Sequence, residues 1–314
     1  MVSAAVRLLA VLAIASVALP AVARAQTATF EDPYDVPQAP RPPTLPELTH
    51  ADDEAVLETT AGALVPSGGG APTHAYVQRL GVEVPLSMRR WYVGAAYELA
   101  GGDAGGGFDV VGGNLELEGR TLWATRTGLA LGGGLSLMLP TANFQDDCPA
   151  TVQPTAAAAV ACSAATLRPW DVTAFVPGAF GVRPFVDVRA LDGPFVVQLR
   201  QGLDLTVGAA SLGDRRLWAT LGGYVGWSFV PQAALGLEAF EAYAITVPGV
   251  RDGARAAIVV SPNVRLALPW VQPAISVFTN VGTPLYGAHA SIWGLRLAIT
   301  LVYDRRAPLR VRAQ

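Results

Sequence analysis

The chain of 314 residues contains no lysine and little charge of either sign. Only 15% of its residues are charged, whereas about 25% is usual in soluble domains. All 22 basic residues are arginine, and 25 acidic residues outnumber them. A nucleic-acid-binding protein needs a basic face, so we expect no nucleic-acid partner. The low charge also makes an ordinary soluble domain a poor description of this chain.

Residues that carry catalysis or bind metals are scarce, because the chain has three histidines and two cysteines. HExxH, phosphate-binding-loop and Gly-x-Ser-x-Gly motifs are absent. His50 and His74 have no nearby cysteine or carboxylate pair, so we predict no metal, no cofactor and no catalytic residues. His289 and Ser291 resemble the His-x-Ser pair of outer-membrane lipid A deacylases. Such a pair needs an acid to orient the histidine, and none occurs in residues 292–303. A hydrolase of this outer-membrane type, with its site at the rim and acting on lipid A or peptides, is therefore a distant alternative.

The N-terminus has the pattern of a secretory signal peptide. Arg7 precedes an apolar stretch over residues 8–22, and Ala23-Arg24-Ala25 is a small-x-small cleavage site. We predict a cleaved signal peptide over residues 1–25. Export places the protein in an oxidising compartment, so we predict a local disulfide between Cys148 and Cys162. Closing a loop of this size contributes about 3 kcal/mol.

The region after the signal peptide is rich in proline and acidic residues. Residues 26–75 hold eight carboxylates and one arginine, a composition that buries too little apolar surface to fold alone. We predict a periplasmic linker here, with at most one short helix over residues 51–61. Residues 76–89 look like a strand, and we assign them to a periplasmic or plug segment. Residues 304–314 form a basic tail.

Alternation with a period of two residues dominates the rest of the chain. In residues 121–140, Leu129, Leu131, Leu135 and other large apolar residues occupy one parity, and small or polar residues such as Arg126 occupy the other. The same alternation recurs in residues 195–207 and 293–303. These segments are longer than the usual strand of five or six residues. Length, alternation and export together predict an all-β, transmembrane, antiparallel, up-and-down β-barrel over residues 90–303.

Two other folds compete with this prediction. Helical membrane spans are disfavoured because the uncharged stretches at residues 217–237 and 266–288 contain prolines, which break helices. A soluble β-sandwich would show a highly charged outer parity. Here the polar parity is mainly glycine, alanine and serine with isolated charges, which suits the crowded inside of a narrow barrel.

We expect about ten strands, with twelve as the alternative. With ten strands beginning at Arg90, all the long connections lie at the outer end, as in bacterial barrels. The strands lie at residues 90–99, 108–118, 122–139, 170–190, 194–207, 216–229, 233–246, 254–268, 271–281 and 291–303. Glu241 is the exception to strict alternation, because it lies on the lipid-facing parity. We therefore predict a bulge at Glu241 or a position near a rim.

Aromatic residues near the ends of the predicted strands form a candidate interfacial girdle: Trp91, Trp123, Trp170, Trp218, Trp227, Trp270, Trp293 and Tyr303. At this level the chain resembles the Gram-negative outer-membrane β-barrel proteins. That resemblance implies contact with outer-membrane lipid and lipopolysaccharide, and insertion by the barrel assembly machinery, which reads a terminal aromatic residue. Tyr303 takes that place, but eleven residues follow it. The sequence GLSLMLPTANF at residues 134–144 is also similar to channels associated with meta-pathway phenol degradation.

The inward parity carries the candidate pore-lining residues: Glu98, Glu116, Arg126, Arg183, Asp187, Arg189, Arg200, Asp204, Glu238, Arg265 and Arg296. In an open barrel these groups would line a nearly neutral aqueous pore. In a closed barrel they would pair with one another across a narrow interior. We therefore predict a passive channel or small-solute transport protein of the outer membrane. The alternative is a closed structural or adhesive barrel that acts through its extracellular loops, such as the one between Cys148 and Cys162.

Overall fold

The computed structural model describes residues 53–303, with a few interruptions. The interruptions are residues 87–90, 104–106, 125–128, 145–154, 209–214, 231, 248–249, 251–253, 267, 269 and 285–288. The predicted signal peptide, most of the predicted linker and the basic tail lie outside the described residues. Arg126 and Cys148 do so as well.

Thirteen strands and one helix make up the described chain. The strands are β1 (Asp53–Pro66), β2 (Thr73–Pro85), β3 (Trp91–Asp103), β4 (Phe108–Gly112), β5 (Leu115–Ala124), β6 (Leu129–Leu139), β7 (Ala179–Asp192), β8 (Phe195–Gly208), β9 (Arg215–Val230), β10 (Ala233–Thr246), β11 (Ala256–Leu266), β12 (Val271–Val281) and β13 (His289–Tyr303). The helix is α2 (Ala156–Leu167). Within the described residues, no helix has the length and apolarity to cross a membrane.

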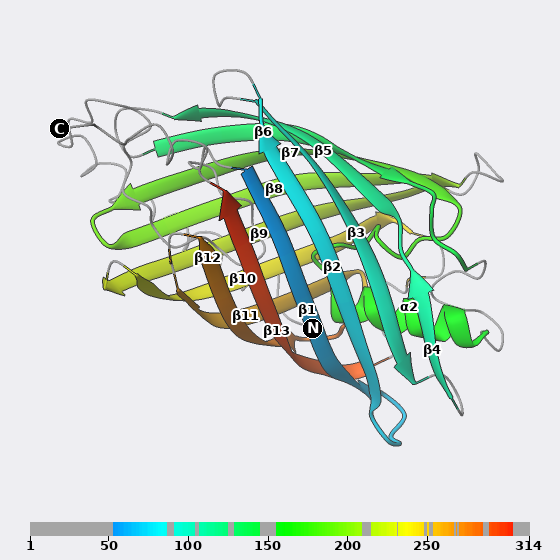
Figure 1. The fold of residues 1–314 in the computed structure, drawn as a ribbon. Coiled ribbons are helices and arrows are strands. Elements are labelled where there is room, and N and C mark those ends of the chain that lie inside the picture. The colour runs from blue at the N-terminus through cyan, green and yellow to red at the C-terminus, as the bar shows by residue number, and fades with distance from the viewer. Residues whose placement is uncertain are drawn as a thin grey trace, which may run out of the picture.

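The strands form one antiparallel sheet that closes on itself (Figure 1). From β5 to β13 each strand pairs with the next in sequence, and β1 pairs with both β13 and β2. The pairing of β2 with β3 completes the ring. β4 and β5 pair with successive parts of β3 and so share one position. Thirteen strands therefore fill twelve positions in a closed barrel.

The expected count of ten strands is wrong, and the alternative of twelve is confirmed. The two additional strands are β1 and β2, which pair over their whole length, so the barrel begins at Asp53 rather than at residue 90. Residues that the sequence assigned to a linker, a short helix and a plug segment are barrel wall. The acidic composition around β1 was misleading because Glu58, although 3% exposed, has an arginine partner in the barrel.

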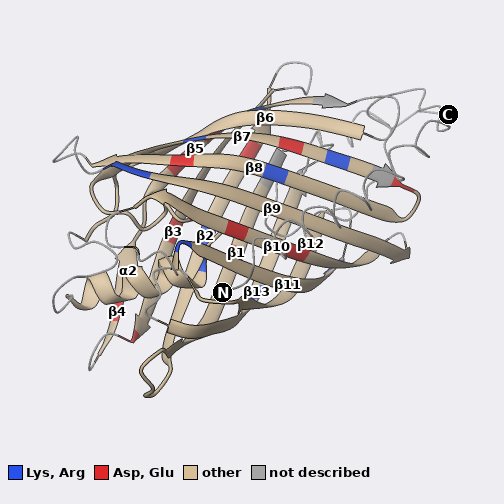
Figure 2. Ribbon diagram, turned by 180° about the vertical axis from the view of Figure 1, so that it is seen from behind, with Lys and Arg blue, Asp and Glu red and all other residues tan. Residues whose placement is uncertain are grey.

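The two faces of the sheet differ as the alternation predicts. Large apolar side chains such as Leu203, Val225 and Leu297 are exposed on the outside. The opposite parity points inward and holds buried polar and charged groups. Charged positions occur along the barrel strands as isolated bands between uncharged stretches (Figure 2). With 10 to 16 residues each, all the described strands other than the five-residue β4 are long enough for a tilted membrane crossing.

The segment after β6 contains a helix that the sequence analysis missed. α2 lies at the end of the barrel where the β1–β2 hairpin turns (Figure 1), and most of its residues are buried. Thr155 caps its N-terminus by accepting a hydrogen bond from the Ala158 N–H. The predicted strand over residues 170–190 is also corrected, because β7 begins only at Ala179. We call residues 155–178 the inner segment.

Candidate functional site in the barrel interior

The inner segment crosses the interior of the barrel. α2 packs its alanine-rich surface against inward residues of β2, β3 and β4, including Val77, Ala100 and Val111. Its last residue, Leu167, packs with Leu64 of β1 and with side chains from β11 and β12. Contacts with opposite walls of the ring therefore hold the inner segment inside the barrel.

Trp170 and Val172 extend these contacts to the far wall. The Trp170 ring lies 5.5 Å from that of Phe240 on β10 and 5.6 Å from that of Phe278 on β12. Val172 packs in a cluster with Trp218 of β9 and alanines of β10 and β11. Phe and Trp rings bury large apolar areas, so these contacts fix the segment on the side opposite α2.

Arg168 ties the inner segment to the β1–β3 wall. Its guanidinium lies 3.2 Å from a carboxylate oxygen of Glu58 and 2.9 Å from one of Glu98. All three side chains are at most 3% exposed. A buried arginine without a partner is costly, so the two glutamates and Arg168 require one another.

Asp171 ties the inner segment to strand β7. Arg183 donates a hydrogen bond to Asp171 at 2.7 Å and another to Thr173 at 2.9 Å. Burial raises the pKa of Asp171, but the guanidinium groups of Arg183, Arg168 and Arg79 outweigh it and hold the pKa below the ordinary value of 3.8. Asp171 is therefore an anion at neutral pH.

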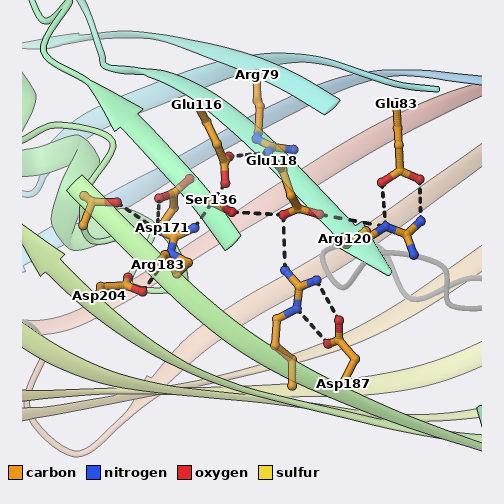
Figure 3. Close-up of polar contacts among 12 residues, drawn as sticks. Arg79, Glu83, Glu116, Glu118, Arg120, Ser136, Asp171, Arg183, Asp187 and Asp204 are labelled. Carbon is orange, nitrogen blue, oxygen red and sulfur yellow. Dashed lines mark hydrogen bonds and ion pairs between the residues drawn. The ribbon is translucent and has the colours of Figure 1, made fainter. Parts of the chain in front are cut away.

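Charged groups on the strands continue these anchors into one network, which we call the upper network. Arg79 of β2 bridges Glu98, at 3.4 Å, and Glu116 of β5, at 2.9 Å. Arg183 bridges Glu116, Asp171 and Asp204 of β8 (Figure 3). The upper network thus runs without a break from Glu58 on β1 to Asp204 on β8.

A second chain of ion pairs, the lower network, lies further along the same strands (Figure 3). Glu83 of β2 pairs with Arg120 of β5, and Glu118 lies 3.9 Å from Arg120 and 3.7 Å from Arg200. Arg200 makes a bidentate pair with Asp187 at 2.8 and 2.9 Å. Charge-assisted bidentate pairs are among the stronger polar contacts in proteins.

The remaining wall, β9–β13, is mainly basic on its inner side. Glu238 of β10 pairs with Arg296 of β13, which also bonds Ser276. Arg216 and Arg265 are further buried arginines on this wall. Its described inward residues therefore include three arginines and one glutamate. On β1–β8, acidic groups outnumber the arginines, so the interior has charge of opposite sign on two sides.

The predicted pore-lining residues all lie inside the barrel wherever the structure describes them, and they are buried or nearly buried. Only Arg126 lies outside the described residues. The upper network brings together Glu98, Glu116, Arg183 and Asp204, and the lower network includes Asp187 and Arg200.

Sequence reasoning missed seven charged members of the two networks: Glu58, Arg79, Glu83, Glu118, Arg120, Arg168 and Asp171. Those on β1 and β2 were missed because these strands were assigned to other segments. The alternation of Arg79, Gly81 and Glu83 was a usable signal. Arg168 and Asp171 belong to no strand, so no period marks them.

The aromatic girdle is wrong for two of its members. Trp218 is fully buried inside the barrel, and Trp170 packs in the interior. Trp218 is the fourth residue of β9, and the parity of that strand turns it inward. Trp170 belongs to the inner segment, because β7 begins only at Ala179. Trp91, Trp227, Trp270 and Trp293 are exposed on the outside near strand ends. The side chains of Trp123 and Tyr303 are not described.

The residues considered for chemistry other than transport do not form a site in the described chain. His289 starts β13, and its buried Nδ1 has no hydrogen-bond partner among the described residues. In the same part of the chain no three His, Cys, Asp or Glu residues cluster as metal ligands do. Cys162 lies half-buried on α2, and its predicted partner Cys148 is not described.

Comparison with known proteins finds similarity in fold. No protein-family model and no curated protein matches the sequence. Among solved structures, an outer-membrane channel from Pseudomonas putida F1 aligns with a TM-score of 0.57 and 13% identity, over 84% of this chain and 99% of that chain. The NanC porin aligns at 0.49 with 12% identity, over 78% and 98%, and the KdgM porin at 0.47 with 10% identity, over 79% and 99%. The alignment with the Pseudomonas putida channel shows that this chain has the fold of an outer-membrane β-barrel protein.

Proposed function

We propose that this protein is a passive outer-membrane channel for small polar solutes, in which the inner segment forms the constriction. The observation that carries the proposal is the placement of ion-paired charges inside a barrel whose outside is apolar. The channel fold of the Pseudomonas putida protein supports this proposal.

The inner segment sets the size of the passage. It occupies the interior at the level of the upper network and contacts both walls. A twelve-stranded barrel is narrower than the 16 to 18 strands of general porins, which leave a wide aqueous channel. Solutes that pass must therefore be small, and their flux depends on where the inner segment lies.

The charge distribution favours ionic or dipolar solutes. Arg216, Arg265 and Arg296 give the β9–β13 wall an excess of positive charge, whereas acids exceed arginines on the other wall. A solute crossing between walls of opposite charge is oriented by the field between them. Zwitterions and small organic ions are the solute classes that such an interior favours.

The sequence and the fold support a proposal for the cellular setting. We infer that the predicted signal peptide directs export, that the barrel assembly machinery inserts the chain, and that lipopolysaccharide and outer-membrane lipid surround it. We further infer that Cys148 and Cys162 form a disulfide that ties the middle of α2 to the residues that precede the helix. Most of α2 is buried, so it offers little surface for an adhesive function.

A liposome-swelling assay tests the proposed function. Purified protein in liposomes should admit small zwitterions such as glycine and exclude oligosaccharides. The matched comparison is Arg168→Met, which removes the anchor of the inner segment and should admit larger solutes than the wild type. Liposomes that stay impermeable to glycine with both proteins would contradict a channel and favour a closed barrel.

A further inference from the structure

Two polar side chains on the outside of the barrel lie in one cross-strand row. Gln201 of β8 is in register with Leu221 of β9, and Leu221 is in register with Glu241 of β10. Glu241 is in turn in register with Ile258 of β11. All four belong to the outward parity, because the alternate residues Arg200, Glu238 and Val259 face the interior.

The predicted bulge or rim position for Glu241 is wrong. The register of β10 with both neighbours is continuous around Glu241, and the nearest shift lies between Ala244 and Thr246. Tyr243 and Ile245, which follow Glu241 along β10, and Leu237, which precedes it, are all exposed on the same outward face. Glu241 therefore lies within the apolar band of the barrel.

Gln201 has the same setting on β8. Leu203 and Leu205 follow it toward the strand end and are exposed on the same face. Its amide nitrogen donates to the backbone oxygens of Thr220, at 2.9 Å, and Gly202, at 3.2 Å. Its Oε1 accepts no hydrogen bond from the described residues. The row thus exposes the Gln201 Oε1, an acceptor without a donor among the described residues, about two strand spacings from the Glu241 carboxyl group.

Glu241 makes no hydrogen bond or ion pair with any described residue. Acyl chains offer no hydrogen-bond partner, so a polar group facing them keeps its full desolvation cost. A protein surface can remove that cost if it brings a complementary polar group. A carboxyl group and an amide group can hydrogen-bond to each other, and Gln201 exposes an amide oxygen on this same surface.

Several side chains between the two polar groups are also small. Ala219 and Gly223 flank Leu221 on β9, and Ala239, which pairs with Gly223, lies beside Glu241 on β10. Small residues let two backbones approach closely in a membrane. Close approach is what side chains as short as Gln and Glu require to meet across an interface.

We propose that the outer face of β8–β10, centred on Leu221, binds a second copy of this chain in the membrane. Two copies in one membrane share the same orientation, so the two-fold axis between them runs along the membrane normal. This operation brings the Glu241 flank of each copy against the Gln201 flank of the other. Because the strands are tilted, the row is inclined to the membrane plane, so the two side chains meet diagonally across the interface. Two equivalent polar contacts, each between a Glu241 carboxyl and a Gln201 amide, then flank the two leucines.

Cysteine crosslinking of the full-length protein in outer membranes tests this interface. Leu221→Cys should give a covalent dimer on oxidation. The matched control is Leu80→Cys, because Leu80 is exposed on β2, on the opposite side of the ring, and it should stay monomeric. Wild-type protein treated in parallel reports any crosslinking by Cys148 and Cys162. A Leu221→Cys protein that stays monomeric, or that crosslinks no better than Leu80→Cys, would overturn the proposal.

The polar contact has its own test by native mass spectrometry in detergent. Glu241→Leu combined with Gln201→Leu should shift the wild-type dimer toward monomer, although it makes the surface more apolar. Glu241→Gln keeps a donor for the partner's Gln201 and should retain the dimer. A wild type that is purely monomeric, or a double variant that dimerises as well as the wild type, would contradict the proposal. Neither outcome depends on whether the barrel conducts.

Discussion

Arg168 of the inner segment lies 3.2 Å from Glu58, in the middle of the first barrel strand, and both side chains are shielded from solvent. The pair joins a connection between strands to the wall of the barrel. It also explains why an acidic stretch near the N-terminus is part of the fold. The inner segment stays inside the barrel only as long as such contacts offset the conformational entropy that it loses when it is held in place.

Arg168→Met should release the inner segment at the level of β1 and β3. The substitution leaves Glu58 and Glu98 without their main partner, and breaking a buried pair in this way costs about 3 to 5 kcal/mol. We expect a lower unfolding temperature and larger current steps in planar bilayers. Restoring neutrality with Glu58→Gln and Glu98→Gln in the same chain should recover part of the lost stability. Unchanged current and stability in Arg168→Met would show that the pair does not hold the segment.

Gly62 provides a steric test of the same contact. A Cβ at Gly62 would lie 2.5 Å from Leu167 Cδ1 and 2.6 Å from the backbone oxygen of Trp293, and such overpacking costs about 1 to 3 kcal/mol. Gly62→Ala should therefore destabilise the barrel and displace the end of α2. Gly119→Ala is the matched control, because nothing lies within 4 Å of its added Cβ. Equal thermal unfolding of both variants would argue against the packing of α2 on β1.

Acidification should release the inner segment only at low pH. The arginines around Asp171 hold its pKa below 3.8 despite its burial. A depressed pKa stabilises the folded state above the unfolded pKa, and this contribution is lost as the pH falls through the folded value. Conductance should thus be constant from about pH 7 to 5 and change below the ordinary aspartate range. Asp171→Asn should show the low-pH conductance already at neutral pH, and a transition of the wild type near pH 6 would be inconsistent with this assignment.

The predicted disulfide can be checked by mass. Intact protein from the outer membrane should be 2 Da lighter than the reduced chain, because a disulfide removes two hydrogens, and a peptide pair should join Cys148 to Cys162. The bond should add about 3 kcal/mol of stability. Two free thiols in protein kept from reductant would refute the pairing.

Much of the barrel wall could be predicted from sequence because one physical rule governs it. A strand between lipid and interior must alternate, and β6, β8 and β13 do so clearly. β1 alternates weakly, since its outward positions include Thr59 and Ala61 and its inward positions include Gly62. The acidic and proline-rich composition before residue 76 therefore favoured a linker over a strand, and the predicted count of ten omitted β1 and β2.

The interior could be predicted only in part for a related reason. Arg183 and Asp204 follow from parity alone, but their partner Asp171 belongs to a connection whose path depends on tertiary contacts. The alanine-rich run of α2 carries no amphipathic pattern, because the helix is buried on most sides. Trp218 was misplaced because proximity to a strand end does not determine which face a side chain takes. Trp170 was misplaced because the strand predicted to begin there begins only at Ala179.

The most direct measurement is single-channel recording in planar bilayers, comparing the wild type with a variant in which a short glycine-serine linker replaces residues 156–174. A constricted channel predicts discrete small current steps for the wild type and several-fold larger steps for the variant, at an equal number of inserted barrels. No steps above background for either protein, with both barrels folded and inserted, would contradict the account.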